Sequence, residues 1–272
     1  MHLGVVAKRN TPRAVELAGR IRENVDATVS VDELTGDRLG IPGEPVAELS
    51  ACDIVVSIGG DGTFLFTARE VSPTPIMGVN LGEVGFLNAV SPEECLEAVR
   101  TAAERIERGD AEFRELPQIR AEGGDGEWTL PPAVNEVSIL GPQRGRDNGL
   151  GIEIRVDGKL YSGGHADGVL VATPTGSSAY NLSEDGPLVH PDVGAFVVTE
   201  MCAEGSMPSL AVPIGGTLTV ALSDADGAVA VADGRTRKRL EPPTRVTLEP
   251  AADPVRVAGP SLDFFAALEK LE

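Results

Sequence analysis

The sequence predicts an α/β plus all-β protein: an N-terminal Rossmann-like domain with a parallel sheet, followed by a C-terminal domain of antiparallel β-strands. In the first hundred residues, short apolar strands alternate with amphipathic helices, which is typical of a parallel sheet covered on both faces. From about residue 113 the pattern changes to the strict alternation of antiparallel strands. We therefore expect domains over 1–112 and 113–257, with a C-terminal helix over 258–272 returning to the first domain.

Each element of the first domain has its own local signal. Thr11 and Pro12 provide the N-cap and the first position of one helix. A second helix is expected to start at Ser91, which is followed by proline and two acids, and to stop at Gly109. The apolar runs that indicate buried strands are 3–7, 53–58 and 74–79.

The second domain is predicted from its turns. Gly151–Val156 alternates apolar and polar residues, and the chain turns at Asp157-Gly158 before a second alternating run, which indicates a β-hairpin. Further short strands are expected at 217–222, 228–232, 245–248 and 255–257. The last residues, 261–271, return to a helical stripe.

The composition excludes several classes of protein. The net charge of −19 comes from 42 acidic and 23 basic residues, and only four of the latter are lysines. A dispersed acidic surface repels nucleic acid and anionic membranes, and it favours a halophilic, cytoplasmic protein. The three cysteines form no CxxC pair and no apolar run reaches membrane-spanning length, so a disulfide scaffold, a zinc cluster and a membrane span are not expected.

The turn Gly59-Gly60-Asp61-Gly62-Thr63 is the first candidate site. It follows a buried strand, whose carboxyl end is where ligands collect in open α/β sheets. Glycines let backbone N–H groups approach phosphate oxygens, and a carboxylate among them suits a site that also holds a cation or a hydroxyl proton. Gly123-Gly124-Asp125-Gly126 repeats these letters between alternating polar segments, so we expect that copy to be a hairpin turn.

Two further segments carry polar groups at predicted strand ends. The run from Asp167 to Tyr180 ends an apolar strand in a turn rich in hydroxyls, which suits either a polar ligand or the capping of a helix. Asn135-Glu136 offers both an amide and a carboxylate to a pair of ribose hydroxyls, or it is a polar pair at a strand edge. From the residues alone, a kinase and a cofactor-binding protein both stay open.

Together the segments resemble the NAD kinase family, whose pattern combines a GGDGT turn, a short NE/D motif and a TPTGSTAY segment in this order. Here they stand as Gly59–Thr63, Asn135-Glu136 and Thr173–Tyr180. The resemblance spans nearly the whole chain. The GGDGT turn is shared with lipid kinases and phosphofructokinases, whereas Thr173–Tyr180 is specific to NAD kinases. Secondary features of the family stand at 80–87, 186–187, 233–234 and 264–265.

The resemblance implies phosphoryl transfer from ATP, another NTP or polyphosphate to the adenosine ribose 2′-hydroxyl of NAD, giving NADP. It implies Asp61 as the catalytic carboxylate, Mg²⁺ carried by the donor without fixed protein ligands, and a homodimer or homotetramer. The residues that it assigns to nucleotide binding are Gly59, Gly60, Gly62, Thr63, Phe86, Asn135, Glu136, Asp167, Thr175, Ser178, Ala179, Tyr180, Ser183 and Asp233. Lys8, Arg9 and Asn10, at the exit of the first strand, either add donors to the phosphates or belong to a solvated loop.

The sequence departs from the family pattern at three places. Ser178 replaces a threonine and keeps the hydroxyl, Glu184-Asp185 replaces an alanine-glycine pair, and the segment after Cys202 lacks a proline-histidine pair. The alternatives to an NAD kinase are a lipid or sugar kinase that shares the glycine turn, and a sensor that binds NAD without turning it over.

Overall fold

The computed structural model describes residues 1–82, 85–124, 126–143, 145, 149–203, 205 and 207–269. The chain divides into two compact units, one of Met1–Leu116 with Pro254–Glu272, and one of Pro117–Asp253. No described helix is long and apolar enough to cross a membrane.

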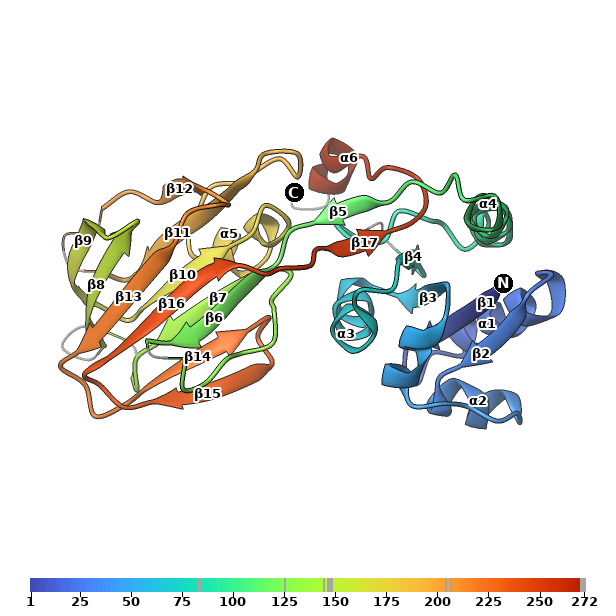
Figure 1. Ribbon diagram of the computed structural model, residues 1–272, viewed down its shortest axis with the longest axis horizontal. Helices are drawn as coiled ribbons and strands as arrows, with labels where there is room; N and C mark the ends of the chain where they lie inside the picture. Colours follow the sequence, from blue (N-terminus) through green and yellow to red (C-terminus); the bar gives the residue numbers. More distant parts are fainter. Residues whose placement is uncertain are drawn as a thin grey trace. The chain divides into compact units, whose positions relative to one another are not determined.

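The first unit is built on a six-stranded sheet in the order β2-β1-β3-β4-β17-β5. The strands from β2 to β17 pair in parallel, and β5 is antiparallel to β17 at one edge. Figure 1 shows β17, from the far end of the chain, lying beside β5. The bounds are β1 His2–Ala7, β2 Thr28–Val31, β3 Ile54–Gly59, β4 Ile76–Asn80, β5 Arg114–Leu116 and β17 Val255–Val257.

Four helices and two shorter helical pieces accompany this sheet: α1 Pro12–Asn24, α2 Glu33–Leu39, α3 Asp61–Val71, α4 Cys95–Arg108, α6 Phe264–Leu268 and the 3₁₀ segment η1 Val46–Ala51. Thr11 is the N-cap of α1 as predicted, but its hydroxyl donates to the Arg9 carbonyl instead of capping. Helix α4 starts later than predicted, because the Ser91 hydroxyl and Glu94 bond to each other in a turn before it.

The strand order places a topological switch point between β1 and β3. Strand β2, which follows β1 in the chain, lies on one side of β1, and β3 lies on the other side of β1. Ala7 pairs with Ile58, and the Lys8 N–H donates to the Ile58 carbonyl (2.8 Å), so the two strands end side by side. Open α/β sheets bind ligands outside the carboxyl ends of strands at such a point.

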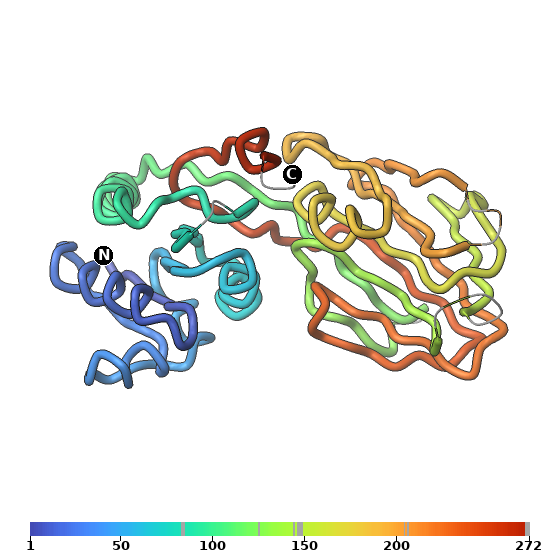
Figure 2. The backbone as a smooth tube through the Cα atoms, turned by 180° about the vertical axis from the view of Figure 1, so that it is seen from behind, coloured from blue at the N-terminus to red at the C-terminus, as the bar shows by residue number. Residues whose placement is uncertain are grey.

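The second unit is a sandwich of two antiparallel sheets, whose strands run in two layers in Figure 2. Ile139 and Phe196 from one sheet and Ile154 and Val220 from the other belong to one apolar core. The first sheet holds β12 Leu210–Pro213, β11 Ala195–Met201, β10 Gly168–Ala172, β7 Glu136–Leu140, β14 Ala228–Ala232 and β15 Thr236–Leu240; the second holds β6 Ile119–Gly123, β16 Thr244–Pro250, β13 Leu218–Ser223, β8 Leu150–Val156 and β9 Lys159–Ala166.

The predicted fold class is confirmed, and so is the hairpin of β8 and β9. Asp157 (φ 48°) and Gly158 (φ 77°) are both left-handed at its turn, as a two-residue hairpin connection requires. The repeated glycine letters do form a turn, since the Gly126 N–H donates to the Gly123 carbonyl (2.8 Å). Asp125 of that turn lies outside the described residues.

The strand predicted at 255–257 belongs to the first sheet and not to the second domain, where it was expected. As β17 it pairs with β4 of the first sheet and with β5, a strand that was not predicted and whose residues fall inside the range given to the second domain. Each has only three residues, which is too short to show a period. The C-terminal helix begins at Phe264, three residues later than the predicted stripe, where Asp263 caps it; Leu271 lies outside the described residues.

Candidate functional site

The glycine turn connects β3 to α3 at the switch point. Strand β3 ends at Gly59, Gly60 is the N-cap of α3, and Asp61 is its first residue. A side chain at Gly59 would lie 2.4 Å from the Thr63 hydroxyl, so only glycine permits this tight turn, while positions 60 and 62 face open space. The turn therefore presents the positive end of a helix with room for a phosphate.

The Asp61 carboxylate is partly buried and accepts three hydrogen bonds from the loop after β4. The Phe86 N–H donates to Oδ2 (2.9 Å), while the Leu87 N–H (3.2 Å) and the Asn88 amide Nδ2 (3.0 Å) donate to Oδ1. Each carboxylate oxygen accepts about two hydrogen bonds. Oδ1 is therefore filled by described groups, and Oδ2 keeps one accepting position.

A cavity of about 1050 Å³ opens beside the end of β1. It is lined by three cations, Lys8 and Arg9 from the loop after β1 and Arg38 from α2, together with Asp37. Among the described residues none of these three cations forms an ion pair. Unpaired cations at one place are notable in so acidic a chain, and they favour an anionic ligand.

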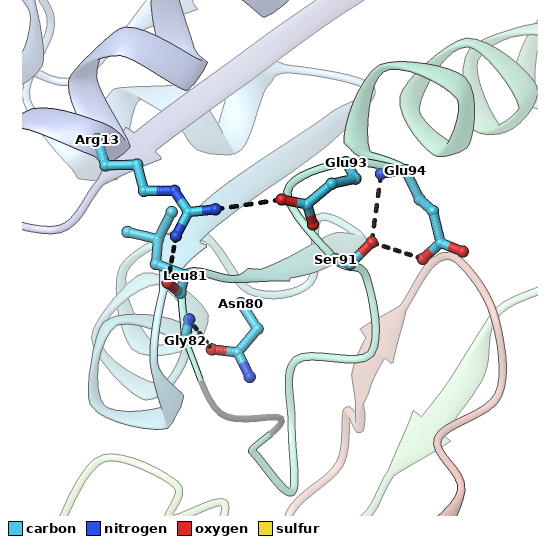
Figure 3. Close-up of polar contacts among 7 residues, drawn as sticks. All are labelled: Arg13, Asn80, Leu81, Gly82, Ser91, Glu93 and Glu94. Carbon is cyan, nitrogen blue, oxygen red and sulfur yellow. Dashed lines mark hydrogen bonds and ion pairs between the residues drawn. The ribbon is translucent and has the colours of Figure 1, made fainter.

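The loop after β4 is tied to helix α1, as Figure 3 shows. Arg13 of α1 donates to the Leu81 carbonyl (3.3 Å) and to the Glu93 carboxylate (3.2 Å). The Asn80 side chain accepts from the Gly82 N–H (3.2 Å). Arg13 and Glu93 are mostly exposed, so this pair orients the loop more than it stabilises the fold.

In the second unit, Asp233 holds the start of β7. Its carboxylate accepts the backbone N–H groups of Val134 (3.0 Å), Asn135 (2.8 Å) and Glu136 (3.3 Å). Asp233 itself lies in the turn after β14 with φ 46°. It thus fixes the backbone of the Asn135-Glu136 pair, a role that the sequence did not indicate.

The Glu136 side chain is 6% exposed, and its Oε2 has no hydrogen-bond partner among the described residues. Burial, with a smaller contribution from the Asp233 charge, raises the pKa of this carboxyl to about 7. An unpartnered buried carboxyl with a raised pKa is typical of a site that binds a ligand.

The hydroxyl-rich segment after β10 divides its hydroxyls between two uses. Thr173 donates to the Val134 carbonyl (2.6 Å) and accepts from the Gly176 N–H, and Ser177 bonds with the Pro174 and Val189 backbone. These two hydroxyls hold the 3₁₀ turn η2 (Thr175–Ser178) in place, although its N-cap residue, Pro174, has no capping side chain. Ser178 bonds only weakly within the turn, to the Thr175 carbonyl (3.3 Å).

The remaining predicted residues surround this turn. Ala179 precedes the short helix α5 (Tyr180–Ser183). The helix is followed by Glu184-Asp185, the pair that differs from the family pattern. Asp185 is exposed and left-handed (φ 60°). The Asp167 carboxylate, 6% exposed, accepts from the Gly145 N–H (2.9 and 3.0 Å).

The predicted residues thus gather in two groups, one in each unit. The first holds Gly59, Gly60, Asp61, Gly62, Thr63 and Phe86; the second holds Asn135, Glu136, Asp167, Thr175, Ser178, Ala179, Tyr180, Ser183 and Asp233. Sequence reasoning missed Asn88 and Arg38. Asn88 lies one residue beyond the segment 80–87 that matches the family pattern, and Arg38 lies on a helix in which no motif was found. No group of three metal-ligating side chains occurs in the described part of the chain.

Backbone N–H groups suited to phosphate, beside a carboxylate with room for a hydroxyl, are the parts that phosphoryl transfer requires. The fold and the first group therefore define a phosphotransferase of the nucleotide-binding α/β class. Two family patterns match the chain: the ATP-NAD kinase N-terminal domain at residues 45–111 and the ATP-NAD kinase C-terminal domain at residues 134–258. The chain belongs to the NAD kinase family.

Similar proteins agree with this assignment over the full length. An NAD kinase of Natronomonas pharaonis is 68% identical over 272 residues, and one of Haloarcula marismortui is 51% identical over 284, each with 100% of both chains covered. These relatives come from halophilic archaea, in line with the expectation from composition.

Two solved structures share the fold. An NAD kinase from Archaeoglobus fulgidus in complex with ATP has a TM-score of 0.79 at 25% identity, covering 100% of this chain and 98% of that one. Yeast NADH kinase complexed with NADH has a TM-score of 0.85 at 21% identity, covering 100% and 87%.

Proposed function

We propose that this chain transfers a phosphoryl group from ATP, another NTP or polyphosphate to the adenosine ribose 2′-hydroxyl of NAD and so forms NADP. One observation carries the proposal: Asp61 stands at the head of α3, at the switch point, with one accepting position of Oδ2 unused by described groups. A hydroxyl that donates to this position is oriented for attack, with Asp61 in the place to receive its proton.

The donor phosphates are assigned to the glycine turn. Gly60 and Gly62 face open space, and the first turn of α3 offers N–H groups that no helical carbonyl accepts. Lys8 and Arg9 at the adjoining cavity supply positive charge to the same anion. Phosphoryl transfer depends on such positioning and charge neutralisation far more than on covalent help from the protein.

Magnesium fits this arrangement as part of the donor complex. Mg²⁺ binds to phosphates and one or two carboxylates while it keeps several waters, so it needs no protein cage. Asp61 offers a carboxylate beside the turn, and the described residues hold no larger ligand cluster. When bound, the ion would neutralise the charge that develops on the donor.

The second group is assigned to the rest of NAD. Asn135 and Glu136, whose Oε2 has no hydrogen-bond partner among the described residues, are assigned to the nicotinamide-side ribose, where they supply a donor and acceptors for its hydroxyls. Asp167 is assigned to the nicotinamide amide, and Thr175, Ser178, Ala179, Tyr180 and Ser183 are assigned to the nucleotide. Phe86, whose ring centroid lies 6.2 Å from that of Phe264, is assigned to the adenine side.

The relatives support these assignments without replacing a test. The Archaeoglobus fulgidus NAD kinase structure contains ATP, and the yeast NADH kinase structure contains NADH, which makes ATP the first donor to examine and NADH a second acceptor. The homodimer or homotetramer and the cytoplasmic location stay predictions.

The experiment supplies purified protein in molar salt with NAD, Mg²⁺ and either ATP or polyphosphate, and measures NADP. We expect NADP with at least one donor. Phosphorylation of diacylglycerol or fructose 6-phosphate in place of NAD would favour the lipid or sugar kinase. Calorimetric NAD binding without NADP from any donor would favour the sensor and overturn the proposal.

A further inference from the structure

Asn88 is a buried side chain beside Asp61 that no motif covers. It is 1% exposed, and its Nδ2 donates to Asp61 Oδ1 (3.0 Å). Its own Oδ1 has no hydrogen-bond partner among the described residues. A buried amide that leaves one of its polar atoms unpaired is costly, which indicates that its remaining hydrogen bond has a specific use.

The amide can take only one orientation here. If it were turned over, its oxygen would face the Asp61 carboxylate, and two acceptors would lie about 3 Å apart. On the other side the amide packs against β4 at Gly78, where any side chain would lie 2.4 Å from Asn88 Oδ1. The carboxylate on one side and the bare backbone on the other hold the amide in place.

The three donors to Asp61 differ in kind. Phe86 and Leu87 donate through the backbone, and only Asn88 donates through a side chain. The Leu87 and Asn88 donors together fill Oδ1, which leaves Oδ2 as the oxygen with an accepting position. The Asn88 bond therefore selects which oxygen of Asp61 can meet a substrate hydroxyl.

We propose that Asn88 is a positioning residue of the phosphoryl-transfer site: its amide fixes the Asp61 carboxylate with Oδ2 toward the acceptor hydroxyl. The inference rests on the proposed function. A misplaced carboxylate weakens binding of the transition state more than binding of NAD, so the loss is expected in kcat and not in the KM for NAD.

The test compares kcat and the KM for NAD in NADP formation by wild type and two variants. Asn88→Leu keeps the approximate size and removes the donor. We expect kcat to fall about tenfold, with the KM for NAD changed less than about twofold. Asn88→Asp keeps the shape of the side chain but places a second carboxylate against Asp61, and kcat should fall at least as far.

Gln118→Glu is the matched control, because Gln118 is a buried amide (5% exposed) in the other unit. It should lower stability and leave kcat nearly unchanged. Circular dichroism establishes that each variant is folded; if both Asn88 variants unfold, Asn88→Ser, which adds no charge and no bulk, is measured in their place. A wild-type kcat in a folded Asn88 variant, or a loss that lies in the KM for NAD alone, overturns the inference. Failure of wild-type protein to form NADP would instead overturn the proposed function.

Discussion

At the scale of single residues, Asp61 and Glu136 are two carboxyl groups in opposite surroundings. Asp61 accepts three hydrogen bonds, two of them from backbone N–H groups, whereas Glu136 is buried with Oε2 unpartnered and Asp233 nearby. Burial without a partner disfavours the charged form of a carboxyl, as at Glu136. The first arrangement holds a carboxylate in one orientation, which suits a group that orients a hydroxyl, and the second suits a group whose partner is a donor on a ligand.

Glu136 gives a prediction about pH and stability. Its pKa in the folded protein is about 7, above the ordinary value of 4.5. The contribution of Glu136 to the free energy of unfolding is therefore fully present below pH 4.5, and it is lost as the pH rises through 7. The loss amounts to about 3 kcal/mol at most. Because Glu136→Gln cannot ionise, the variant should gain stability relative to wild type between pH 5 and pH 8.

The measurement is urea unfolding at the two pH values, followed by the fluorescence of Trp128. Trp128 is the single tryptophan of the chain and lies in the same unit as Glu136. A constant difference in unfolding free energy between wild type and Glu136→Gln at pH 5 and pH 8 would show that Glu136 does not titrate in this window.

At the scale of elements, the group of predicted residues in the second unit depends on direct backbone contact between two segments of the chain. The turn η2 packs directly on the chain before β7, since a side chain at Gly176 would lie 1.9 Å from the Asn135 carbonyl oxygen. The Thr173 N–H also donates to that oxygen (2.8 Å). The two segments predicted separately from the sequence are therefore one structural unit, and neither can shift without the other.

Gly176→Ala should destabilise the second unit by about 3 kcal/mol. The new methyl group would clash with the backbone of Asn135, which cannot move aside as the end of a flexible side chain could. Gly194→Ala is the control, as that position faces open space in the same unit and its φ is not positive. Urea unfolding by Trp128 fluorescence compares the two. Equal midpoints for both variants would contradict the packing described.

The sequence predicted the elements whose signals are local. The β8–β9 hairpin follows from Asp157-Gly158, and the position of the glycine turn follows from the buried strand before it. Strand β17 was expected in the wrong domain and strand β5 was not predicted, because three-residue strands take their partners from tertiary contacts. The contact of Asn88 with Asp61 and the bonds of Asp233 to the start of β7 were missed for the same reason. The partners lie 27 residues apart in the first case and about 98 in the second.

At the scale of the whole molecule, the charge is the dominant feature. A net charge of −19 makes the folded chain repel itself, and salt reduces that repulsion because the screening length falls from about 10 Å at 0.1 M to about 3 Å at 1 M. Against this background Lys8, Arg9 and Arg38, which form no ion pair with any described residue, stand at one cavity. An anionic donor is attracted there while most of the surface repels it.

The urea midpoint of the wild-type protein should therefore rise when NaCl is increased from 0.1 M to 2 M. NaCl is preferred to sulfate, because sulfate also strengthens the burial of apolar groups. Sucrose, which does not screen charge, serves as the control for solvent exclusion. A midpoint that does not change with NaCl would show that self-repulsion is not what limits stability.

The most direct test of the central claim is NADP formation by Asp61→Asn beside wild type, with NAD binding measured on both. The variant keeps the shape of the side chain and loses the carboxylate that orients the hydroxyl. The account predicts NADP formation reduced about a thousandfold with NAD affinity nearly unchanged. An Asp61→Asn protein that forms NADP at the wild-type rate would contradict it.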